Sequence, residues 1–194
     1  MLMTGVGATC AGDTCGADEP PLPSVTEQRT HFGLWCVISS PLTLSMDFAN
    51  ASLVDAVWPI VTNVAAIAVN QAWAGAAGGQ LLADYSANVT LQHCTPGWAG
   101  DKPCTLPRTQ VWWKPLPGGS VAIFMANHDP AAAHEVRVDF AALPAPPPCA
   151  PACLVTDVWA QAEAGLHTGA YAATLQPHDS AFVVLHGAGA PWTG

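Results

Sequence analysis

Three sets of side chains carry reactive or modifiable groups: the carboxylate Asp47, the cysteines and the asparagines of two sequons. Asp47 follows the short apolar run 42–46. A carboxylate at the carboxyl end of a buried barrel strand is a common place for a catalytic group. The competing interpretation is that Asp47 caps the following turn or braces the floor of a pocket, and we favour this second role.

Six of the seven cysteines form close pairs, which are Cys10 and Cys15, Cys94 and Cys104, and Cys149 and Cys153. Such pairs are typical of chains that fold in an oxidising compartment. For the first pair, a disulfide competes with a zinc site, but the Cys-x2-Cys spacing and paired histidines of zinc sites are missing. A disulfide in the second pair would close a loop rich in proline and glycine.

Two sequons, at Asn50 and Asn88, are candidate glycosylation sites. Together with the cysteines they predict a secreted, vacuolar or lysosomal protein. Residues 1–8 carry no basic residue and no extended apolar core, so we expect no signal peptide in this chain. A secretory interior without such a signal suggests that a front end is missing.

The charge composition excludes several function classes. Five basic and fourteen acidic residues give a net charge of −9, which disfavours binding to nucleic acid or to an anionic membrane. The most apolar region, 54–69, is interrupted by Asp55, Pro59 and Asn63, which argues against a membrane span. Only 10% of residues are charged, so either the composition is biased or some apolar surface is covered by a partner.

The first secondary-structure element that the sequence predicts is a helix. Ser24 and Glu27 form a capping box, and a stripe of small and apolar residues at helical spacing then includes Cys36. This placement predicts a buried small side chain rather than a reactive thiol. We expect Pro41 to end the helix and residues 42–46 to form a buried parallel strand.

Further along, residues 50–58 read as a helix that Pro59 restarts. The Gly/Ala-rich segment 72–79 is the predicted linker, with one domain over 1–77 and a second over 78–194. Beyond it, the pattern changes to short strands at the spacing of an antiparallel β-sandwich, with a hairpin over 110–127 and strands over 136–140, 154–159 and 180–186.

Four short sequence motifs in these segments resemble those of one known family. They are Arg29 to Trp35 (RTHFGLW), 40–47 (SPLTLSMD), 67–71 (IAVNQ) and the turn in 111–119 (VWWKPLPGG). In this order and spacing they resemble the carboxyl-terminal part of the α-galactosidases (melibiases) of glycoside hydrolase family 27, up to about residue 187. The resemblance implies an α/β fold, the last units of a TIM (β/α)8 barrel, followed by an all-β antiparallel sandwich.

The resemblance also implies an activity, which is retaining hydrolysis of terminal α-linked galactose by two carboxyl groups about 5–5.5 Å apart. The family uses no metal or organic cofactor. Its two catalytic aspartates lie upstream of Met1, so we expect no catalytic residue in this chain and no activity of the chain alone. Met1 matches a methionine that lines the family's galactose pocket, and Cys149 and Cys153 match a disulfide of some members.

Other functions stay open at this point. The tryptophans, including the adjacent Trp112 and Trp113, could stack on sugar rings, but a core role is favoured because only one of two neighbours in a strand faces each side. The chain could be a non-catalytic carbohydrate-binding or pseudoenzyme module, or a partner that completes a barrel. A homo-oligomer of the full-length form is left open. A serine or cysteine hydrolase is disfavoured because no Gly-x-Ser-x-Gly elbow occurs.

Overall fold

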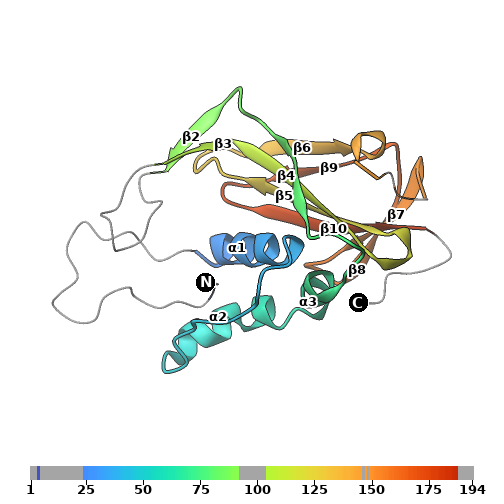
Figure 1. Ribbon diagram of the computed structural model, residues 1–194. Helices are drawn as coiled ribbons and strands as arrows, with labels where there is room; N and C mark the ends of the chain where they lie inside the picture. Colours follow the sequence, from blue (N-terminus) through green and yellow to red (C-terminus); the bar gives the residue numbers. More distant parts are fainter. Residues whose placement is uncertain (1–3, 5–23, 92–103, 146, 148, 188–194) are drawn as a thin grey trace.

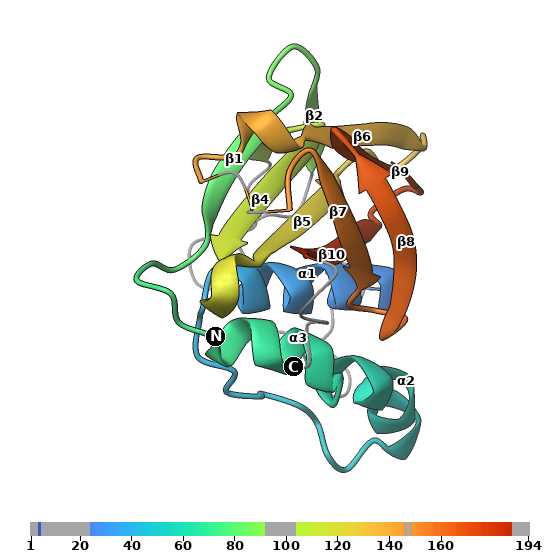
Figure 2. The same ribbon diagram turned by 90° about the vertical axis from the view of Figure 1, so that its right-hand side faces the viewer.

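Helices and two β-sheets form three layers in the described part of the chain (Figure 1). The structure is a computed structural model that describes residues 4, 24–91, 104–145, 147 and 149–187. The helical layer lies against one face of a six-stranded sheet, and a two-stranded sheet covers the other face. Figure 2 shows the helices below the strands from a second direction.

Helix α1, Val25–Val37, starts where the capping box predicted. The Ser24 amide donates to Glu27 Oε2 at 2.7 Å, and the Glu27 amide donates to Ser24 Oγ at 3.1 Å. Phe32 and Cys36 are buried against the sheet. The helix packs closely there, since a Cβ on Gly33 would lie 2.4 Å from the Phe124 ring.

The end of α1 differs from the prediction, because the helix stops at Val37 and not at Pro41. Ser39 has a φ of +60°, and the Ser40 amide donates to the Trp35 carbonyl at 3.1 Å. The Ser39 amide donates to the Cys36 carbonyl at 3.2 Å. This pair of bonds is a Schellman motif, in which the left-handed residue is usually glycine. The chain therefore leaves the helix before the proline can act.

The strand predicted over 42–46 is wrong, since only Leu44 forms an isolated bridge. A parallel strand is stabilised by neighbours on its edges and helices over its faces, and the described residues give this segment no such sheet. Helix α2, Ala51–Val61, follows, and it runs through Pro59 instead of restarting there. Helix α3, Val64–Gln71, is the last helix before the linker.

No single described helix is long and apolar enough to cross a membrane. Helices α2 and α3 reach the required length and hydropathy only when taken together, and they are bent by 58° at the break between them.

The six-stranded sheet is antiparallel throughout and has the order β1-β4-β5-β10-β7-β8. Its strands are Gly79–Ala83 (β1), Thr109–Pro115 (β4), Val121–Asn127 (β5), Ala152–Asp157 (β7), Ala162–Thr168 (β8) and Ser180–His186 (β10). The predicted hairpin over 110–127 is β4, the turn Pro117–Gly119 (η2) and β5. Gly118, with a φ of +72°, makes that tight turn.

Strands β6, His134–Asp139, and β9, Ala170–Leu175, pair to form the second layer of the sandwich. A separate antiparallel ribbon joins β2, Asn88–Leu91, to β3, Cys104–Pro107. The strands predicted over 136–140, 154–159 and 180–186 correspond to β6, β7 and β10. The short helix Phe140–Ala142 (η3) follows β6. The antiparallel β-sandwich is confirmed.

Two hydrophobic cores lie on opposite faces of the central sheet. In β5, Phe124 and its alternate neighbours face the helices, whereas Ile123 and Met125 face β6 and β9. Trp112 packs against the helical core and Trp113 against the other, and both are half-buried. Neither is thus an open stacking platform. The domain boundary at 77/78 stays a prediction, although the helices and the sandwich share one core.

Candidate functional site

The junction between the helices and the sandwich holds several buried polar side chains that make specific contacts. Asn63 is the N-cap of α3, and its Oδ1 accepts from the Ala66 amide at 2.9 Å. Its Nδ2 donates to the Val158 carbonyl at 3.0 Å and to the Trp159 carbonyl at 3.3 Å. One buried amide therefore starts a helix and ties that helix to the end of β7.

Lys114 joins the same two layers at the other end of α3. Its side chain is fully buried, and its Nζ donates to the carbonyls of Val69 and Asn70, the latter at 3.0 Å. A buried cation is costly unless it is hydrogen-bonded, and here it faces the negative end of a helix. Burial lowers the pKa of the Lys114 ammonium, and burial raises the pKa of the nearby Cys36 thiol to about 12. Cys36 is therefore a protonated core residue.

Arg29 and Trp159 line a cleft between α1, α2 and the end of β7. The cleft has a volume of about 320 Å³, and its other walls come from Val25, Thr26, Ala56, Pro59, Ile60 and Asn63. Arg29 Nη2 donates to Asp179 Oδ1 at 2.6 Å, and its guanidinium lies 5.9 Å from the centre of the Trp159 ring. With its charge paired to Asp179, Arg29 can hold α1 against the start of β10 and leaves the cleft mainly apolar.

Asn63, Lys114 and Arg29 together hold the helical layer on the sandwich by hydrogen bonds, and we call these three residues the clamp. Amide, ammonium and guanidinium donors reach from one layer to carbonyl or carboxylate acceptors on the other. Asp47 lies outside the clamp, on the surface, and its Oδ1 accepts from the Ala49 amide at 3.1 Å. That contact is the turn-capping role favoured from the sequence. In the described ranges, no group of three or more His, Cys, Asp or Glu side chains could hold a metal ion.

Comparison with protein families assigns the sandwich. Residues 107–185 match the family described as the alpha galactosidase C-terminal beta sandwich domain. This part of the chain is similar to the C-terminal β-sandwich domain of α-galactosidases. The resemblance to the carboxyl-terminal part of the family 27 α-galactosidases is thereby confirmed. No curated protein matches the chain.

Solved structures share the fold of the α-galactosidase-like chain over most of its length. α-Galactosidase I from Mortierella vinacea is 18% identical, with a TM-score of 0.64 over 85% of this chain and 36% of that one. A GH27 β-L-arabinopyranosidase from Geobacillus stearothermophilus is 22% identical, with a TM-score of 0.67 over 93% of this chain and 34% of that one. The α-galactosidase from Saccharomyces cerevisiae is 14% identical, with a TM-score of 0.67 over 96% of this chain and 46% of that one. The chain thus spans between a third and a half of these structures.

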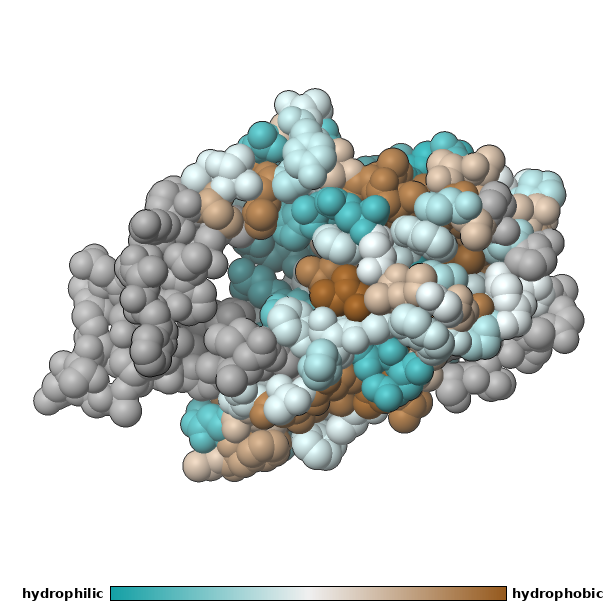
Figure 3. Space-filling model, in the orientation of Figure 1, coloured by the Kyte–Doolittle hydropathy of each residue, from teal (hydrophilic) through white to brown (hydrophobic). Residues whose placement is uncertain are grey.

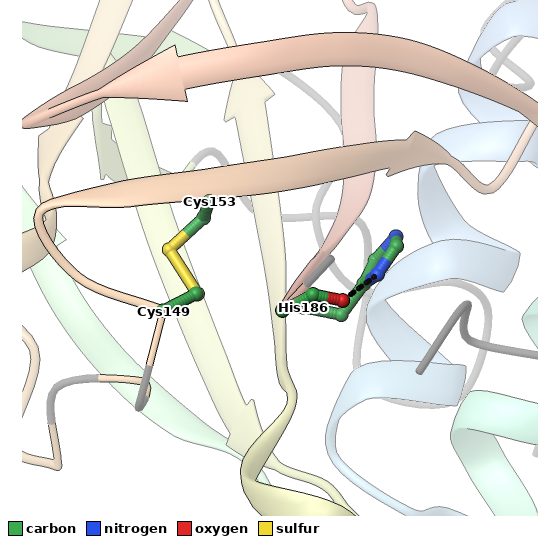
Figure 4. Close-up of a disulfide and its surroundings, with 4 residues drawn as sticks. Cys149, Cys153 and His186 are labelled. Carbon is green, nitrogen blue, oxygen red and sulfur yellow. Dashed lines mark hydrogen bonds between the residues drawn. A yellow bond between two sulfur atoms is a disulfide. The ribbon is translucent and has the colours of Figure 1, made fainter. Parts of the chain in front are cut away.

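The predicted disulfide residues have different outcomes in this α-galactosidase-like chain. Cys149 and Cys153 form a disulfide at the entry to β7 (Figure 4), with their Cα atoms 4.9 Å apart. Cys104 is also disulfide-bonded. Cys10, Cys15 and Cys94 lie outside the described residues, as does Met1, so their predicted roles stay predictions.

The two sequons lie on the surface. Asn50 is exposed and caps α2, with its Oδ1 accepting from the Leu53 amide at 3.2 Å. That bond leaves the Nδ2 atom, the site of glycan attachment, outside the cap. Asn88 is exposed on β2, and Thr90 lies exposed two residues later. Both positions are accessible, and their glycosylation stays a prediction.

Sequence reasoning missed the clamp residues Asn63 and Lys114. Asn63 directly precedes the apolar run 64–69, which is a helix-start signal. Lys114 follows two tryptophans in a strand, and as the next residue but one after Trp112 it shares that residue's face. A lysine on the core-facing side of a predicted strand indicates a buried cation, and this signal was present in the sequence.

Proposed function

We propose that this chain is the carboxyl-terminal part of a retaining glycosidase that acts on terminal α-linked galactose. The family match of residues 107–185 carries the proposal. We further propose that residues 1–77 are the last units of a (β/α)8 barrel. In support, the aligned α-galactosidases cover up to 96% of this chain, a share too large for the sandwich alone.

In this proposal the two catalytic carboxyl groups come from outside the chain. Retaining hydrolysis needs them about 5–5.5 Å apart, one to attack the anomeric carbon and one to protonate the leaving oxygen. The residues described here have a supporting role. Asn63, Lys114 and Arg29 hold the helices on the sandwich, and the chain alone is inactive.

A second candidate, a chain that completes a barrel supplied by another polypeptide, is favoured by the surface of the helical layer. Phe48, Trp58, Val64 and Trp73 are 65%, 51%, 66% and 64% exposed. Apolar surface follows the lower, helical edge of the molecule in Figure 3. Large apolar side chains gathered on one layer are typical of a contact surface.

We also propose an oxidising compartment, secreted, vacuolar or lysosomal, for the full-length protein. The Cys149–Cys153 disulfide supports this proposal, because disulfides persist mainly outside the cytosol.

The test starts from the native protein, captured with an antibody raised against residues 110–127. Its intact mass is measured, and the captured material is assayed on p-nitrophenyl α-D-galactoside, with the β-galactoside as the matched control. We expect hydrolysis of the α-linked substrate alone. Proton NMR monitors the anomeric form of the released sugar, and the first product should be α-galactose, as retention requires. A separate second polypeptide in the active material would support the barrel-completing chain. Galactose binding without hydrolysis would refute the glycosidase and indicate a sugar-binding module.

A further inference from the structure

Helix α3 ends without a left-handed cap residue. Its C-cap residue, Ala72, is extended, with φ −64° and ψ 135°, and its amide donates to the Ala68 carbonyl at 2.9 Å. The last carbonyls of a helix have no partner within the helix. Those of Val69 and Asn70 accept from Lys114 Nζ. A side chain of the sandwich thus takes the place that a glycine turn fills in many helices.

Asn70 carries this contact further into the helical layer. While its carbonyl accepts from Lys114, its Nδ2 donates to the Ser40 carbonyl at 2.9 Å and to the Trp35 carbonyl at 3.4 Å. Asn70 is only 7% exposed. The Trp35 indole nitrogen also donates, to the Pro41 carbonyl at 3.0 Å. Two side chains therefore hold the start of the segment 40–47, and one of them is anchored by Lys114.

We infer that Lys114 is a positioning residue, which sets the place of the segment 40–47 through Asn70. The sandwich then does more than cover the helices, because one of its strands determines where the connection between α1 and α2 runs. The meaning for catalysis rests on the proposed function, in which residues 1–77 are the last units of a barrel.

A lysine with only a structural role would stabilise the whole fold, without a separate effect on the segment 40–47. Hydrogen exchange separates the two roles, because local opening and global unfolding expose different amides. The 194-residue chain is compared with Lys114→Met, which keeps the unbranched apolar part of the side chain and removes its donor. Arg137→Met is the matched control, since Arg137 lies on the same sandwich and its side chain is 59% exposed.

In Lys114→Met, we expect protection to fall at least tenfold over 69–72 and over 40–47, and to stay unchanged in β5 and β10. The NMR signal of the Trp35 indole N–H, assigned with Trp35→Phe, should shift in the same variant. Arg137→Met should change none of these. Unchanged exchange over 40–47, or an equal loss in β5 and β10, would overturn the inference.

If Lys114→Met does not fold, Asn70→Ala tests the second link. We expect faster exchange over 40–47 with 69–72 unchanged, because the Lys114 contacts to the backbone carbonyls remain. Full protection of 40–47 in this variant contradicts the inference. Neither measurement depends on hydrolysis, so a failure here leaves the proposed activity to its own assay.

Discussion

Replacing Ser39 with glycine should stabilise the protein, because Ser39 has the backbone conformation that glycine adopts most easily. Its φ is +60°, and an L-residue in the left-handed region is destabilised by roughly 1–2 kcal/mol. Its hydroxyl oxygen is also buried without a hydrogen-bond partner, which costs about 1–3 kcal/mol. Against these gains, glycine loses about 0.5–1 kcal/mol of backbone entropy on folding.

The sum predicts that Ser39→Gly raises the free energy of unfolding by about 1–4.5 kcal/mol, which corresponds to a Tm roughly 2–18 °C higher for a chain of this size. Urea unfolding followed by tryptophan fluorescence and by circular dichroism measures the change. Ser40→Gly is the matched control, because Ser40 is not among the positive-φ residues and the substitution should be slightly destabilising. If Ser39→Gly is no more stable than the wild type, the left-handed serine is not a source of strain.

Two further predictions concern a close backbone contact and a carboxylate. Gly78→Ala should be destabilising by at least 2 kcal/mol in thermal unfolding, since its Cβ would lie 2.0 Å from the Val37 carbonyl oxygen; Gly79→Ala, with open space around it, should be nearly neutral. The hydrogen bond from His134 is the main reason that the pKa of Asp129 is lowered to about 2. The stabilisation from Asp129 should therefore be present above pH about 4 and be lost as the pH falls toward 2. Asp129→Asn should abolish that pH dependence of the free energy of unfolding. If the variant still loses the same stability between pH about 4 and 2, the assignment to Asp129 is wrong.

The parts of the fold that were predicted correctly depend on neighbours in sequence. The capping box at Ser24 involves residues three positions apart, and the hairpin of β4 and β5 closes through a short Gly-rich turn. The end of α1 was missed because Ser39 adopts a conformation that serine rarely favours. The strand over 42–46 was wrong because a strand depends on partners, and none follows from an apolar pattern alone.

The candidate site was harder to predict for the same reason. The role of Lys114 depends on carbonyls that lie 45 and 44 residues earlier in the chain. A sequence pattern can place a lysine on the inner face of a strand, but the helix end that it meets is a property of the packed layers. Asn63 was the more predictable of the two, because its N-cap contact is local.

The pairing of α1 with β10 has a consequence for synthesis on the ribosome. Arg29 meets Asp179, and Thr30 meets Ser180, across 150 residues of sequence. At roughly 5–20 residues per second, α1 leaves the ribosome about 8–30 s before its partner strand is made. During that time the face bearing Phe32 and Cys36 lacks β10, one of the strands that cover it. The nascent chain should therefore engage chaperones until β10 emerges. A stop codon between residues 72 and 180 should yield an aggregation-prone product even though α1, α2 and α3 have been translated.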